Sequence, residues 1–167
     1  MQKSSRIGLY KFIGCLLVMV LFASSQLRAQ DVPSVRWMSF EQLSDSLSVK
    51  PKKVFIDFYT GWCTYCRKMD KVVFTDPEVV KELNDDFYAV RMNAESRDTI
   101  YFEGQAFIND QLGKTRNPVH QLAQLLATRD GQFAPPALII LDETFTVKNR
   151  YFEFLSSKKM LRALKSK

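Results

Sequence analysis

Residues 54–69 have the sequence Val54-Phe-Ile-Asp-Phe-Tyr-Thr-Gly-Trp-Cys-Thr-Tyr-Cys-Arg-Lys-Met69. The first six residues are β-branched or aromatic apart from one Asp, a pattern typical of a central strand covered on both faces. A Thr-Gly-Trp turn follows, and a helix is expected from about Cys63 to Val73. The two cysteines, Cys63 and Cys66, therefore lie where a buried strand passes into a helix.

Strands and helices alternate along the rest of the chain. Further strands are expected at 35–39, 87–92, 137–142 and 145–151, and helices at 39–47, from 75, from 117 and at 156–164. The apolar side chains expected to face the core from two of the helices are Met69, Val72 and Val73, and Val119, Leu122, Leu125 and Leu126. This order predicts an α/β fold with helices on both faces of a mixed central sheet, its first strands parallel. Residues 95–133 form an insert, and 96–114 remain open between helix and loop.

Length and composition indicate one compact domain. The chain has 167 residues, of which 46% are apolar and 13% aromatic, and this content excludes a disordered chain. Its net charge of +6 is unevenly placed, because the first 29 residues contain four basic side chains and no acid. The remaining chain carries +2, too little to indicate nucleic-acid binding.

The N-terminal segment has the pattern of a secretory signal peptide. A basic start is followed by an apolar run of 12 residues and a polar exit of small residues. We expect residues 1–29 to be the signal peptide, cleaved after Ala29, and residues 30–167 to be the exported domain. An uncleaved N-terminal membrane anchor is the alternative, although the run is short for a spanning helix.

The Cys63-Thr-Tyr-Cys66 motif carries the chemistry. A cysteine at a helix N-terminus faces unpaired N–H groups and the positive end of the helix dipole, which favour its thiolate. Cys66, one turn later, is then placed to attack a mixed disulfide formed by Cys63. Haem attachment is excluded because Arg67, rather than His, follows the second cysteine. A zinc site lacks ligands, since only His120 remains, so no metal is expected. A purely structural disulfide stays open.

These residues resemble the active-site strand, turn and helix of the thioredoxin superfamily. The continuation Phe74-Thr-Asp-Pro-Glu-Val-Val-Lys-Glu-Leu83 is most similar to the secreted branch that resembles the C-terminal domain of the thiol:disulfide reductase DsbD. The resemblance is specific for 53–92, resumes at 135–151 and is weak between them. It implies a thioredoxin fold in which residues 95–133 are a helical insert before the cis-proline strand.

The resemblance also implies roles for particular residues. Asp57 corresponds to the buried acid that exchanges a proton with the second cysteine, and a structural, hydrogen-bonded acid is the alternative. The residues implied to contact substrate or tune the site are Trp62, Thr64, Tyr65, Pro135 and Pro136. Pro136 matches the family's cis-proline better than Pro135. Pro135 lacks the N–H that usually pairs with a substrate chain.

The sequence therefore predicts an exported thiol–disulfide oxidoreductase that uses Cys63, Cys66 and Asp57 and needs no cofactor. We expect the protein to reduce disulfides in other proteins, with electrons supplied by a membrane or periplasmic thiol donor. We expect it to act in the periplasm or to be secreted. A disulfide oxidase or isomerase with the same cysteines is one alternative, and a non-catalytic binding module is another. His120 is expected to be a surface residue or a packing residue of the core, without a role in the chemistry. The basic, amphipathic C-terminal helix leaves contact with a membrane surface open.

Overall fold

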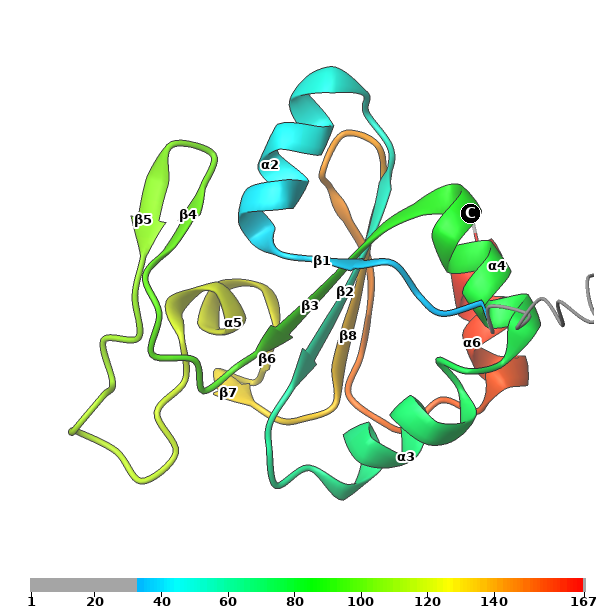
Figure 1. The fold of residues 1–167 in the computed structure, drawn as a ribbon. Coiled ribbons are helices and arrows are strands. Elements are labelled where there is room, and N and C mark those ends of the chain that lie inside the picture. Colours follow the sequence, from blue (N-terminus) through cyan, green and yellow to red (C-terminus); the bar gives the residue numbers. More distant parts are fainter. Residues whose placement is uncertain (1–32, 167) are drawn as a thin grey trace, which may run out of the picture. The chain divides into compact units, whose positions relative to one another are not determined.

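The computed structural model describes residues 33–166 (Figure 1). Its main sheet has five strands in the order β1-β3-β2-β8-β9. Their bounds are Trp37–Met38 (β1), Lys53–Tyr59 (β2), Phe87–Asn93 (β3), Ala137–Leu141 (β8) and Val147–Tyr151 (β9). The helices are Phe40–Val49 (α2), Thr64–Val72 (α3), Pro77–Asp86 (α4), Gln121–Leu126 (α5) and Ser157–Lys165 (α6). The predicted mixed sheet and the order of its elements are confirmed.

Strand β2 lies at the centre of this sheet. It runs parallel to β3, with Asp57 opposite Arg91, and antiparallel to β8, with Phe58 opposite Ala137. All five residues from Val54 to Phe58 are buried, as the apolar pattern predicts for a strand covered on both faces. The C-terminal end of β2 and the N-terminal end of β8 consequently meet at one edge of the sheet.

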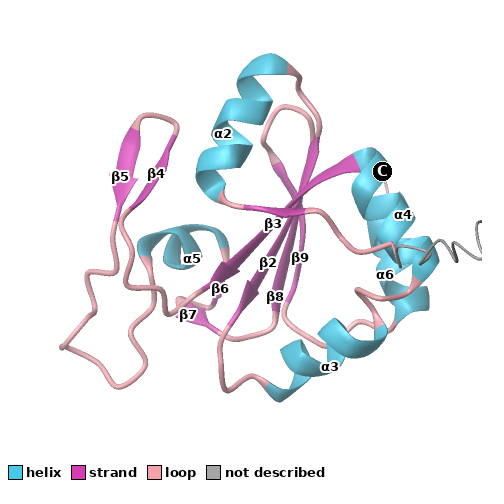
Figure 2. Cartoon of the chain, in the orientation of Figure 1, coloured by secondary structure: helices cyan, strands magenta, loops and turns pink. Residues whose placement is uncertain are grey.

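Helices cover both faces of the sheet (Figure 2). Alternate β2 side chains separate two cores, because successive residues of a strand point to opposite faces. Phe55 packs on one face with Met69 of α3, Leu83 of α4 and Met160 of α6. The side chains of the other face belong to α2, α5 and the insert, and those that pack with Ile56 include Phe40, Leu43, Phe102, Leu122 and Ala123. The described domain has three layers, with the sheet in the middle.

The insert contains one short helix and two hairpins. Strands β4 (Ile100–Phe102) and β5 (Gln105–Phe107) pair antiparallel, as do β6 (Thr128–Arg129) and β7 (Gln132–Phe133). The first hairpin turns through Glu103 and Gly104, both at positive φ, a conformation that glycine adopts without strain. The helix of the insert is α5, so the insert is less helical than expected, and a strand pair lies within 100–107.

Three expectations about helices were wrong in detail. Val72 and Leu125 were expected to face the core, but they are 50% and 64% exposed. The helix expected from Asn117 begins instead at Gln121, because His120 provides the N-cap by accepting a hydrogen bond from the Leu122 N–H. The predicted signal peptide lies outside the described residues. Between residues 33 and 166, no helix combines the length and the apolar character needed to cross a membrane.

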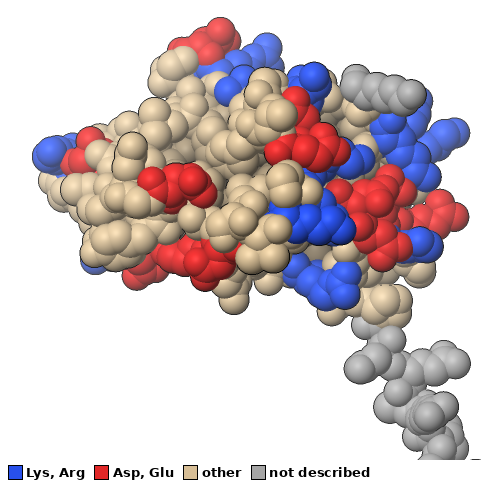
Figure 3. All heavy atoms as spheres, turned by 90° about the horizontal axis from the view of Figure 1, so that it is seen from above, with Lys and Arg blue, Asp and Glu red and all other residues tan. Residues whose placement is uncertain are grey.

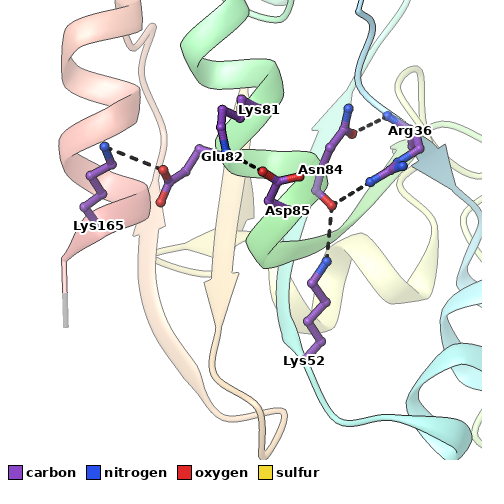
Figure 4. A network of polar contacts seen from close by, with 7 residues as sticks. All are labelled: Arg36, Lys52, Lys81, Glu82, Asn84, Asp85 and Lys165. Carbon is purple, nitrogen blue, oxygen red and sulfur yellow. Dashed lines mark hydrogen bonds and ion pairs between the residues drawn. The ribbon is translucent and has the colours of Figure 1, made fainter.

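The surface of the described domain carries both signs of charge. Figure 3, seen from the end of the described domain opposite α3, shows acidic and basic side chains close together on the right of that face and mostly uncharged side chains on its left. Polar contacts join the elements around α4. Asn84 accepts hydrogen bonds from the Arg36 N–H at Oδ1 and from the Arg36 guanidinium at its carbonyl, each at 2.8 Å (Figure 4). Lys165 of α6 pairs with Glu82 of α4 at 3.6 Å. These contacts attach Arg36, which directly precedes β1, and the last helix, α6, to α4.

Candidate redox site

The two cysteines form a disulfide at the start of α3. The chain turns after β2 with the Cys63 N–H donating to the Thr60 carbonyl at 3.2 Å. Cys63 is the N-cap of α3, and its Sγ accepts a hydrogen bond from the Cys66 N–H at 3.1 Å. Its sulfur therefore lies at the positive end of the helix dipole, as the motif predicts. The Sγ atoms of Cys63 and Cys66 are bonded to each other.

Both cysteines are buried in the disulfide form. Cys63 is 3% exposed, and Cys66 is 2% exposed. In the disulfide, the Cys63 sulfur is turned towards Cys66 and the first turn of the helix, which accounts for this burial. Trp62, directly before Cys63, and Tyr65, two residues after it, are 55% and 58% exposed. The turn and the first helical turn around the buried sulfurs thus present two aromatic rings to solvent.

Polar contacts hold the turn that contains the first cysteine. Arg67 donates to the Gly61 carbonyl at 2.7 Å and to the Thr64 hydroxyl at 3.3 Å. The Trp62 Nε1–H donates to Glu95 Oε1 at 3.0 Å, which joins the turn to the residues just after β3. Arg67 and Glu95 were not predicted site residues. Arg67 was noted only because it excluded haem attachment, and no local sequence signal indicates the contact of Glu95.

Asp57 is fully buried in β2, as the apolar strand around it predicts. Burial raises the pKa of its carboxyl to about 7, because removal from water penalises the charged form, while the nearby Arg91 opposes this effect. The Arg91 Nε lies 3.2 Å from Asp57 Oδ2, but the pair does not form a hydrogen bond. Asp57 is thus placed to gain or lose a proton near neutral pH.

Arg91 connects Asp57 to the redox helix. Its guanidinium forms a second ion pair with Asp70 of α3 at 2.5 Å, and it lies over the rings of Tyr59 and Trp37, 4.6 and 5.4 Å from their centroids. Sequence reasoning missed both Arg91 and Asp70. The signal for Arg91 was present, since a parallel pairing of the two predicted strands can place a basic residue opposite the buried acid.

Buried polar atoms without a hydrogen bond gather at this site. Within residues 33–166, the buried side-chain nitrogen and oxygen atoms that lack such a bond are both carboxylate oxygens of Asp57, the Thr60 hydroxyl and Arg91 Nε. Unsatisfied buried groups destabilise a fold by about 1–3 kcal/mol each. These atoms lie at the end of β2 that leads to the redox helix and at the β3 position opposite Asp57, where each calls for a specific explanation.

The cis-proline lies at the same edge of the sheet. The peptide bond between Pro135 and Pro136 is cis, so Pro136 is the cis residue. Pro136 is also the residue that the sequence resemblance matches better to the family's cis-proline. Pro136 directly precedes Ala137, which pairs with Phe58 near the end of β2. The buried His120, by contrast, lies in the insert, where its Nδ1 caps α5 and its Nε2 is 3.2 Å from the Asp98 carbonyl. In the described part of the chain, no three His, Cys, Asp or Glu side chains are grouped so that they could hold a metal.

Comparisons with known proteins agree with this geometry. The Thioredoxin-like family model matches residues 36–142. The thiol:disulfide interchange protein DsbD of Photorhabdus laumondii is 41% identical over 49 residues, which are 29% of this chain and 8% of that protein. The chain thus matches only a small part of this curated relative.

Two solved structures share the fold. The DsbH oxidoreductase superposes with a TM-score of 0.55 at 16% identity, covering 85% of this chain and 90% of that one. A thioredoxin from Thermus thermophilus gives a TM-score of 0.54 at 21% identity, covering 78% and 85%. The chain therefore belongs to the thioredoxin-like family and carries, in Cys63 and Cys66, the cysteine pair of its thiol–disulfide oxidoreductases.

Proposed function

We propose that this protein is an exported thiol–disulfide oxidoreductase that reduces disulfides in other proteins. The observation that carries the proposal is the Cys63–Cys66 disulfide at the N-terminus of α3, on the helix that follows the strand with the buried Asp57. A helix N-terminus stabilises a thiolate, and the second cysteine lies one turn further on. A structural disulfide with a separation of three residues closes a very short loop and stabilises little.

The proposed exchange begins from the reduced pair. The Cys63 thiolate attacks one sulfur of a substrate disulfide, forming a mixed disulfide and releasing the other substrate sulfur as a thiolate, which takes up a proton. Cys66 then loses its proton and attacks the Cys63 sulfur, which releases the second substrate thiol. The substrate gains two electrons, and the protein is left with the Cys63–Cys66 disulfide. A dithiol donor restores the reduced pair by the same steps in reverse.

Asp57 is proposed to accept the proton from Cys66. It shares the face of β2 that packs against α3, whose buried side chains are Cys66 and Met69. A carboxyl whose pKa is about 7 can take up and return a proton at neutral pH with little cost. Arg91 and Asp70 are proposed to act as positioning residues that tune this titration through their ion pairs.

The proposal also covers the export of the protein, the direction of electron transfer and the protein partners. The N-terminal pattern of residues 1–29 supports export to the periplasm or beyond, either as a cleaved domain or on an N-terminal anchor. Similarity to a segment of a thiol:disulfide interchange protein supports protein partners with disulfides or thiols, including a membrane or periplasmic thiol donor. The similarity to the reducing branch of the family favours reduction over oxidation or isomerisation.

Reduction of insulin by the full chain tests the proposal. With dithiothreitol as donor, we expect the wild type to accelerate insulin reduction and Cys63→Ser to abolish the acceleration. Equal rates with both proteins would instead support a binding module, which the 3% exposure of Cys63 favours. Equilibration with glutathione measures the redox potential of the cysteine pair, which indicates the direction of electron transfer. A potential near that of thioredoxin, about −270 mV, supports a reductant, and one near about −120 mV supports an oxidase.

A further inference from the structure

The exposed face of the redox helix is basic. Arg67, Lys68 and Lys71 lie on the solvent side of α3. The one acid of this helix, Asp70, is half-buried and pairs with Arg91. The fully exposed charged side chains of the helix are therefore all positive.

The N-terminus of α6 borders this positive surface. Ser157 donates a hydrogen bond to the Val72 carbonyl at 3.2 Å, so the first turn of α6 lies against the last turn of α3. The exposed Lys158 lines a hollow that Asp76 and Glu78 also line, so the charge there is mixed. We call Arg67, Lys68 and Lys71 the basic patch. Among the carboxylates of residues 33–166, none forms an ion pair with these three side chains.

Aromatic side chains support the basic patch next to the cysteines. The Tyr65 ring lies 6.2 Å from the ring of Phe154, and the Lys68 ammonium lies 4.7 Å from the same Phe154 ring. Tyr65 stands between the two cysteines in sequence, so the patch begins directly beside the disulfide.

An acid lies next to the other exposed aromatic ring. Glu95 accepts the Trp62 Nε1–H, which places a carboxylate beside that ring. In the sequence, the cysteines are thus preceded by Trp62, whose ring contacts an acid, and followed by the three bases of the patch. Such a distribution orients a charged partner as it approaches and speeds its association.

We propose that the basic patch docks an acidic segment of the protein whose cysteine reacts with Cys63. This inference rests on the proposed function and adds the substrate class: disulfide partners with Asp or Glu on the side of their cysteine that faces α3. Unpaired surface lysines with an exposed aromatic neighbour fit carboxylates at a solvent-accessible interface, where charge sets selectivity and association rate more than affinity.

A membrane surface is a poorer occupant of the same patch. A helix that binds in a lipid interface inserts an apolar face. The apolar residues of α6, among them Met160, Ala163 and Leu164, are buried in the core instead. This arrangement removes the lipid-binding face that the amphipathic pattern left open.

The test compares three short peptides, each with one disulfide, that differ only in flanking residues: acidic, neutral or basic. The measured quantity is kcat/KM for their reduction by the full chain, at low and at high salt. For the wild type we expect the acidic peptide to be preferred over the neutral one about ten-fold at low salt. This preference should largely disappear at about 0.5 M salt, where the Debye length is short.

Two variants locate the effect. Lys68→Glu/Lys71→Glu should remove or reverse the preference for the acidic peptide. The matched control is Lys50→Glu/Lys148→Glu, which makes the same charge change at the other end of β2, where Lys148 follows Val147, the partner of Leu141. For the control variant, the ratio of kcat/KM with the acidic peptide to kcat/KM with the neutral peptide should equal that of the wild type.

Three results would overturn the inference. Equal rates for the three peptides, a preference for the basic peptide, or an acidic preference that survives in Lys68→Glu/Lys71→Glu each contradict docking at the basic patch. Binding of the wild type to anionic vesicles, lost in the same variant and without any preference among the peptides, would assign the patch to a membrane. Failure of the proposed function is distinguishable, because the neutral peptide would then not be reduced either.

Discussion

Asp57 and Arg91 face each other on the neighbouring parallel strands β2 and β3, with Arg91 Nε 3.2 Å from Asp57 Oδ2. The carboxyl is nevertheless without a hydrogen bond from any described residue, and it is fully buried. The ion pair therefore compensates only part of the cost of burying a charge, and the pKa of Asp57 stays raised at about 7.

Asp57→Asn should stabilise the protein at alkaline pH. Because the pKa of Asp57 is higher in the folded protein than its ordinary 3.8, the folded state favours the protonated carboxyl. The favourable contribution is complete below pH 3.8 and is lost as the pH rises to about 7. Asn mimics the neutral form at every pH, so the variant should exceed the wild type by up to about 4 kcal/mol at pH 8.

Urea unfolding of the disulfide form at pH 4, 6 and 8 measures this difference. The gain from Asp57→Asn should shrink as the pH falls. A gain that does not depend on pH, or a loss of stability at pH 8, would show that Asp57 is a well-paired structural acid.

Substitutions of Arg91 and Asp70 should move the titration of Asp57 in opposite directions. Arg91 lowers the pKa of Asp57, and Asp70 raises it. Arg91→Gln should consequently raise the pKa of Asp57 by about 1 or more, and Asp70→Asn should lower it. NMR titration of carbon-13-labelled aspartate follows the carboxyl directly, and Arg91→Lys is the control that keeps the charge. Shifts of the same sign in both variants would contradict the positioning role of this pair.

His120 should make the insert sensitive to acid. Its Nδ1 accepts the Leu122 N–H, so the ring is neutral, and burial lowers the pKa of His120 below 6.5, although Asp98 and Asp110 oppose this effect. The stability contribution is present above pH 6.5 and is lost as the pH falls through the lowered pKa. We expect faster amide exchange in residues 98–126 at pH 5 than the intrinsic exchange rates explain.

The matched variant for this prediction is His120→Asn, which keeps an N-cap acceptor but does not titrate in this range. Both proteins should carry Asp57→Asn. The pKa of Asp57 is about 7, so its titration would otherwise change the stability in a neighbouring pH range and in the opposite direction. Replacement by Ala should lower the free energy of unfolding by about 1 kcal/mol or more, from the lost cap. The same acid response in His120→Asn would show that another group is responsible.

Much of the fold followed from local sequence patterns. The near-continuous apolar run of β2 indicated a central strand, and the helix expected from residue 75 corresponds to α4, which Asp76 caps. The insert was harder, because its helix has only six residues and its start depends on a histidine cap that local propensity does not favour. The exposure of Val72 and Leu125 depends on tertiary packing, since helical spacing alone does not show where the buried stripe ends.

The site was predictable where its residues are close in sequence. Cys63, Cys66 and Trp62 share one segment, and Asp57 is conspicuous as the acid in an apolar strand. Arg91, Asp70 and Glu95 reach the site from β3, from α3 and from the residues after β3. Their contacts depend on strand register and helix orientation, so the local pattern did not reveal them.

Cys66→Ser should trap partners, whereas Cys63→Ser should not. Without the Cys66 thiol, the mixed disulfide on Cys63 cannot be resolved and accumulates. Incubation of the reduced variants with a disulfide-containing protein, followed by non-reducing electrophoresis, measures the adduct. Adducts in comparable amounts with Cys63→Ser would show that Cys66 is the attacking cysteine.

The central claim is that the N-terminus of α3 keeps Cys63 reactive as a thiolate, and pH-dependent alkylation of the reduced protein tests it most directly. Cys66→Ser isolates the signal of Cys63, and Cys63→Ser serves as the reference. We predict that the pKa of the Cys63 thiol lies clearly below the value of about 8.5 for a free cysteine. A pKa at or above that value, or no alkylation of the folded protein at any pH, would contradict the account.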